Sequence, residues 1–103
     1  MSFGVPKRSL ATIIDTLALF GDIEEAAVFG SRTIGNHKNG SDIDLVIYGA
    51  NIREATVDKL KILLNEELPL PYHFDVIHYE QLTSPSLKEH IDKYAKPLYT
   101  KPA

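Results

Sequence analysis

The chain is organised around two short stretches, VFGSR at residues 28–32 and GSDIDLVI at residues 40–47. In the second stretch Asp42 and Asp44 alternate with aliphatic residues, which predicts a β-strand with both acids on one face. Side chains two positions apart on a strand start about 6.6 Å from each other, so the two carboxylates can converge on one cation or on a pair. We therefore expect a metal ion, or strong solvation, at this strand. Taken alone, the acidic pair would also fit a solvated strand face or the metal-binding pair of a glycosyltransferase.

Gly30 and Ser31 follow an apolar segment, residues 23–29, that predicts another strand. A glycine lets the backbone approach a ligand closely, and N–H groups at the start of a helix favour an anion. Alone, a Gly-Ser pair would be an ordinary turn at the end of a strand. Beside the two acids it indicates a corner that binds phosphate.

Length and charge limit what the chain can do. At 103 residues we expect a single domain, residues 1–103, with little room for a separate substrate domain, so whatever the protein acts on must be met partly by another surface. The 44% hydrophobic and 24% charged residues are typical of a globular protein. The net charge of −3 argues against strong nucleic-acid binding.

Two features that the sequence lacks restrict the class of protein further. No apolar run approaches the length of a bilayer span and the N-terminus has no signal-peptide core, so we expect a cytoplasmic protein without a membrane partner. The lack of cysteine excludes disulfides, thiolate nucleophiles and cysteine-type zinc sites.

The remaining elements follow from apolar spacing. A first helix is predicted between Pro6 and Gly21, and a second over residues 52–68, ended by prolines. Residues 72–79 predict a strand, and residues 86–98 predict a final helix. This order favours an α/β or α+β domain with a small mixed β-sheet flanked by helices.

Asp75 lies on the predicted strand at residues 72–79, among apolar neighbours, and His73 shares its face and could orient its carboxylate. If that strand is the neighbour of the acidic strand, as a short connection through one helix would allow, Asp42, Asp44 and Asp75 form one cluster. Otherwise Asp75 is an ordinary acid on an edge strand. The sequence leaves this choice open.

These residues resemble the nucleotidyltransferase superfamily whose best-known fold is that of DNA polymerase beta, and more narrowly its minimal nucleotidyltransferase (MNT) members in prokaryotes. The motif of that family is a hydrophobic residue, Gly, then Gly or Ser, a spacer of about ten residues, two acids alternating with hydrophobic residues, and a third acid on a later strand. The matching segments are Phe29-Gly30-Ser31, Asp42-Ile43-Asp44-Leu45 and Phe74-Asp75-Val76.

The resemblance implies a nucleotidyltransferase that moves a nucleoside monophosphate, AMP from ATP, to a hydroxyl with the help of two Mg²⁺ ions. Asp42, Asp44 and Asp75 would be the catalytic and metal-binding residues, with Asp75 also able to take the proton of the acceptor. The residues that would hold the triphosphate are Gly30, Ser31, Arg32 and Ser41. Arg32 fits a surface salt bridge equally well.

The resemblance also implies a partner. Minimal members lack an acceptor-binding domain and are commonly encoded with a helical HEPN-type toxin, which suggests an antitoxin that adenylylates a tyrosine of that toxin. Three alternatives stay open: a binding protein that neutralises its partner by occlusion alone, a small-molecule transferase of the aminoglycoside type, and a transferase for an RNA 3′ end. A homo-oligomer is also compatible with the sequence.

Overall fold

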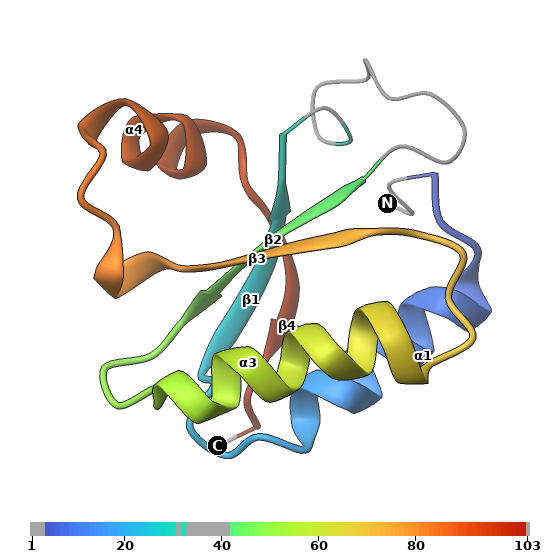
Figure 1. Ribbon diagram of the computed structural model, residues 1–103. Helices are drawn as coiled ribbons and strands as arrows, with labels where there is room; N and C mark the ends of the chain where they lie inside the picture. Colours follow the sequence, from blue (N-terminus) through green and yellow to red (C-terminus); the bar gives the residue numbers. More distant parts are fainter. Residues whose placement is uncertain (1–3, 31, 33–41, 103) are drawn as a thin grey trace.

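The computed structural model describes residues 4–30, 32 and 42–102, which form a four-stranded sheet with helices on both faces (Figure 1). Ser31 and Ser41, two of the expected triphosphate contacts, lie outside the described residues.

The sheet is mixed, as predicted. Its strands are β1 (Glu25–Phe29), β2 (Ile43–Tyr48), β3 (Phe74–His78) and β4 (Lys96–Thr100), in the order β3-β2-β1-β4. Strand β1 runs antiparallel to β2 and to β4, whereas β2 and β3 are parallel. The connection from β2 to β3 passes through one helix, as parallel strands require.

Helices cover the sheet unequally. Helices α1 (Lys7–Ala18) and α3 (Glu54–Ile62), the latter continued by a π-helical turn at Leu63–Glu67, pack on one face (Figure 1). Helix α4 (Pro85–Tyr94) packs on the other face. Alternate residues of β1 divide accordingly: Ala26 and Val28 belong to the larger core with α1 and α3, and Ala27 and Phe29 to the smaller core with α4.

Local sequence explains where the helices begin. The Oγ of Ser84 accepts a hydrogen bond from the N–H of Leu87 at 3.3 Å, which caps α4. Helix α3 is capped from a distance, because the carboxylate of Asp22 accepts hydrogen bonds from the backbone N–H of Arg53 at 3.1 Å and from the hydroxyl of Thr56 at 2.6 Å. The predicted apolar stripes are confirmed, since Leu17 of α1 and Leu60 of α3 are fully buried.

The prediction for the end of the chain is wrong in part. The helix predicted over residues 86–98 ends at Tyr94, and Lys96–Thr100 forms a fourth strand against β1. Pro97 cannot continue a helix, and Lys96 before it is disfavoured in the helical region. A proline is tolerated on an edge strand, and β4 lies at the edge of the sheet, where Pro97 is paired with Ala27.

Within the part of the chain that is described, none of the helices has the length and apolarity needed to cross a bilayer.

Candidate active site

Two of the predicted acids face each other across neighbouring strands. Asp44 of β2 and Asp75 of β3 are direct partners in the parallel register, which realises the strand adjacency that the sequence left open. Neighbouring strands lie about 4.8 Å apart, so the two carboxylates meet on one face. Asp42 precedes β2 directly and approaches the same place from the end of the sheet. The structure therefore brings Asp42, Asp44 and Asp75 together.

The electrostatics of this cluster favour a cation. Burial raises the pKa of Asp44, and the negative charges of Asp75 and Asp42 raise it further, with a hydrogen bond between Asp44 and Asp75 acting in the same direction. His90 of α4 partly opposes this shift. Because the carboxylates disfavour one another's charge, a bound divalent cation would relieve the repulsion.

Gly30 ends β1 at the position that the sequence singled out. Its φ of 79° lies in the left-handed region, which disfavours residues with a side chain. A Cβ built at residue 30 would overlap with Oδ2 of Asp44 and lie 3.3 Å from its Cγ. Gly30 therefore serves two needs, because it turns the chain and leaves the space that the carboxylate of Asp44 occupies.

The sequence predicts His73 beside Asp75, and the structure places it beside Asp42 as well. Its Nδ1 lies 3.6 Å from Oδ2 of Asp42 and 3.9 Å from Oδ1 of Asp75. Ligand atoms of the three side chains all lie within 4.8 Å of one another.

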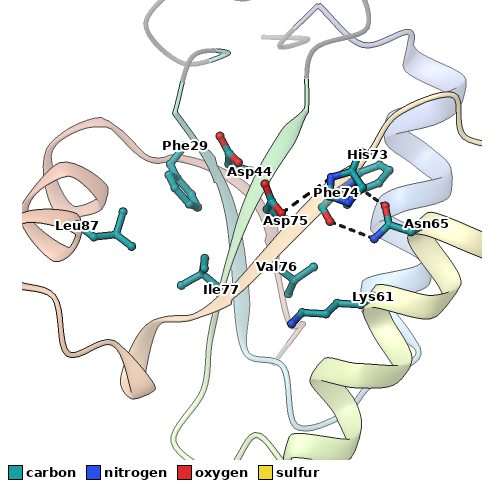
Figure 2. A pocket seen from close by; sticks show the side chains of 10 residues that line it. All are labelled: Phe29, Asp44, Lys61, Asn65, His73, Phe74, Asp75, Val76, Ile77 and Leu87. Atoms are coloured by element: carbon teal, nitrogen blue, oxygen red, sulfur yellow. Dashed lines mark hydrogen bonds and ion pairs between the residues drawn. The ribbon is translucent and has the colours of Figure 1, made fainter.

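Asp44 and Asp75 open onto a pocket of about 470 Å³ (Figure 2). Strand β3 contributes Phe74 to Ile77, α3 contributes Lys61, the π-helical turn after it contributes Asn65, and α4 contributes Leu87. The pocket is lined by Phe29, Asp44, Lys61, Asn65, His73, Phe74, Asp75, Val76, Ile77 and Leu87. The residues from α3 and α4 were missed by sequence reasoning, because they reach the pocket only through tertiary packing.

Asn65 holds the start of β3 in place. Its Nδ2 donates to the carbonyl of Phe74 at 3.0 Å, and the N–H of Phe74 donates to its Oδ1 at 2.7 Å (Figure 2). The carboxamide thus pairs with the open edge of β3 as a neighbouring strand would. Since Phe74 directly precedes Asp75, these two hydrogen bonds fix the backbone that carries the third acid.

Arg32 is buried, which contradicts the surface position that the salt-bridge interpretation assumed. Its side chain is 5% exposed, and the guanidinium lies 5.2 Å from the ring centroid of Tyr72, a cation–π contact. Its contact with a triphosphate stays a prediction.

The donor set fits the divalent cation that the resemblance implies. Carboxylate oxygens are the side-chain ligands that Mg²⁺ prefers, and an imidazole nitrogen is accepted by Mn²⁺ and heavier transition metals. The space that Gly30 leaves for Asp44 lets the acids gather without steric hindrance.

Solved structures share this fold. The chain aligns with a toxin–antitoxin crystal structure containing AMP-PNP at a TM-score of 0.71 and 17% identity, covering 94% of this chain and 75% of that one. It aligns with the MntA-HepT toxin–antitoxin complex at a TM-score of 0.70 and 18% identity, covering 93% and 74%. A third match, at a TM-score of 0.69 and 18% identity, covering 92% and 72%, is a complex of a tri-AMPylated Shewanella oneidensis HEPN toxin with an MNT antitoxin.

Sequence comparison gives the family. A search among curated proteins found no significant match. The family model described as "Polymerase beta, Nucleotidyltransferase" matches residues 11–103, which include Gly30 and all three acids. This chain belongs to the polymerase beta nucleotidyltransferase family.

Proposed function

We propose that the protein is a Mg²⁺-dependent nucleotidyltransferase that transfers AMP from ATP to a tyrosine hydroxyl of a HEPN-type toxin and thereby acts as its antitoxin. The observation that carries this proposal is the cross-strand pair of Asp44 and Asp75 beside Gly30, which is the arrangement a two-metal phosphoryl transfer requires. The solved complexes support the partner and the nucleotide, since one contains AMP-PNP and another an AMPylated HEPN toxin.

Each acid has a role in this proposal. Asp42, Asp44 and Asp75 would hold two Mg²⁺ ions, which when bound would neutralise the negative charge that develops on the transferred group. Asp75 would accept the proton of the acceptor hydroxyl. The hydroxyl oxygen forms a bond to the α-phosphorus of ATP, the bond from that phosphorus to the oxygen bridging it to the β-phosphorus breaks, and pyrophosphate leaves.

The nucleotide would lie on the side of Gly30. The backbone N–H groups at this corner would contact the triphosphate, and Ser31, Arg32 and Ser41 are proposed as further contacts. These roles rest on the family motif at residues 29–31 and 42–45.

The pocket beside Asp75 supports a tyrosine as acceptor. Phe29, Ile77 and Leu87 give it an apolar wall that suits an aromatic ring, and the carboxylates lie where the phenol oxygen would end. A volume of about 470 Å³ suits one side chain of a partner and not a whole acceptor domain. The net charge of −3 favours a protein acceptor over a nucleic acid. We further propose that residues 1–103 act as one domain in the cytoplasm.

The test uses the double variant Asp42→Asn with Asp44→Asn. Wild-type protein incubated with the cognate HEPN toxin, ATP and Mg²⁺ should leave AMP on a toxin tyrosine, seen by mass spectrometry, and the double variant should bind the toxin without modifying it. If the double variant protects cells from the toxin as well as wild type does, neutralisation is by occlusion and the catalytic account fails. An adduct on an aminoglycoside or on an RNA end, and none on the toxin, would assign a different acceptor.

A further inference from the structure

The side chain of His73 lies beside two of the three acids of the candidate site. The imidazole lies between the carboxylates of Asp42 and Asp75, with its Nδ1 at 3.6 Å and 3.9 Å from one oxygen of each. Asp44 is the direct partner of Asp75 on the neighbouring strand, and Figure 2 shows Asp75 between Asp44 and His73. Asp75 therefore belongs to the acidic pair with Asp44 and also to a trio of possible metal ligands with Asp42 and His73.

The distances suit a shared cation. Ligand atoms about 2.1 Å from an octahedral ion lie about 3.0 Å apart when adjacent and about 4.2 Å apart when opposite. The two distances from Nδ1 fall inside this range. Ligand atoms of the three side chains lie within 4.8 Å of one another, and small side-chain rotations would bring them to the spacing that one ion needs. Such rotations are possible because all three side chains are more than half exposed.

We propose that His73 binds, through Nδ1, the divalent cation that Asp42 and Asp75 hold, and that this nitrogen shifts the preference of the site from Mg²⁺ toward Mn²⁺. The inference rests on the proposed function in one respect, because both require a divalent cation bound at Asp75. Mg²⁺ prefers oxygen ligands, whereas an imidazole nitrogen adds affinity for Mn²⁺ and later transition metals.

A competing role gives a different result. If His73 acted only as an ion-pair partner of Asp42 and Asp75, its positive charge would repel a metal ion. Removing it would then leave the binding of divalent cations unchanged at a pH where imidazoles are neutral, and strengthen it at a pH where they are charged. If His73 is a ligand, removing it weakens Mn²⁺ binding and changes Mg²⁺ binding less.

The experiment measures Mn²⁺ binding to the full chain by electron paramagnetic resonance at mildly alkaline pH, where imidazoles are neutral. His73→Ala and His73→Gln should each weaken Mn²⁺ binding by about tenfold or more and weaken Mg²⁺ binding, measured by competition, by less. In pulsed measurements the bound Mn²⁺ of the wild type should show coupling to a ligand nitrogen, and both variants should lose it. His90→Ala is the matched control, because His90 lies outside the trio and the coupling should persist in that variant.

Nitrogen coupling that survives in His73→Ala, or Mn²⁺ binding in that variant that is as tight as in wild type or tighter, would overturn the inference. The outcome is separable from the proposed function. Wild type that transfers AMP with Mg²⁺ but shows no nitrogen coupling refutes the role of His73 alone. Nitrogen coupling without any AMP transfer refutes the proposed function and leaves the metal ligand standing.

Discussion

Replacing Gly30 by alanine tests the geometry on which the site depends. Residue 30 has a φ of 79°, and a residue with a side chain pays about 1–2 kcal/mol in that left-handed conformation. The added Cβ would overlap with Oδ2 of Asp44, whose half-buried side chain can rotate away without a shift of the backbone. We therefore expect Gly30→Ala to lower the free energy of unfolding by only about 1–2 kcal/mol.

Gly30→Ala should reduce the rate of AMP transfer far more than it reduces the stability of the fold. A carboxylate displaced by about 1 Å from its productive position costs on the order of 100-fold in rate. Urea unfolding measures the first effect and the rate of AMP transfer measures the second. A variant that folds and transfers AMP at the wild-type rate would refute the account of Gly30 and Asp44.

Gly21→Ala is the matched control. A Cβ at residue 21 would meet no atom within 4 Å, and among the described glycines only Gly4 and Gly30 have a positive φ. The same substitution there should leave AMP transfer unchanged and either preserve the free energy of unfolding or raise it by about 0.4–1 kcal/mol. Equal losses in Gly21→Ala and Gly30→Ala would mean that the overlap with Asp44 is not the cause.

Three further predictions follow from individual contacts. Asp44→Asn should abolish AMP transfer yet raise the melting temperature at neutral pH. Burial and the neighbouring acids raise the pKa of Asp44, so its charge destabilises the folded protein, and melts at several pH values should show the gain shrinking as the pH falls through that pKa and wild type takes up the proton. Asp22→Ala removes the cap of α3 and should cost about 1–2 kcal/mol in urea unfolding at neutral pH. Burial acts to raise the pKa of Asp22, but hydrogen bonds from Thr56 and Arg53 lower it overall, so the advantage of wild type should disappear as the pH falls through this lowered pKa. Asn65→Ala should cost about 1–2 kcal/mol and slow AMP transfer, whereas Asn51→Ala, at an exposed loop residue, should change neither, and an unchanged transfer rate in Asn65→Ala would argue against the clamp on β3.

Most of the fold could be predicted because local patterns and tertiary packing agree. The alternation at residues 42–47 and the helical spacing after Pro6 each appear in the structure as β2 and α1. Strand β4 was missed because apolar spacing at Tyr94 and Leu98 imitates one face of a helix. The signal that opposes a helix is Pro97, and its weight depends on an open edge of β1 that no local pattern reveals.

The parts of the site that belong to a local sequence motif could be predicted. The acids and Gly30 could be found from the motif, whereas the sequence left open whether β3 is the neighbour of β2, which the structure shows by pairing Asp44 with Asp75. The positions of Asn65 and Leu87 could not be found, because they depend on how the π-helical turn after α3 and helix α4 pack against the sheet. The contact of His73 with Asp42 depends on the register of β3 against β2, which the sequence does not give. The capping of α3 by Asp22 joins residues more than thirty positions apart, a distance at which sequence spacing carries no signal.

The most direct test of the central claim is the binding of a non-hydrolysable ATP analogue to this chain, measured by calorimetry with and without Mg²⁺. If Asp44 and Asp75 form one cation-dependent triphosphate site beside Gly30, the analogue should bind only with Mg²⁺, and Asp75→Asn should weaken that binding. Binding that needs no Mg²⁺ and is unaffected by Asp75→Asn would contradict the account.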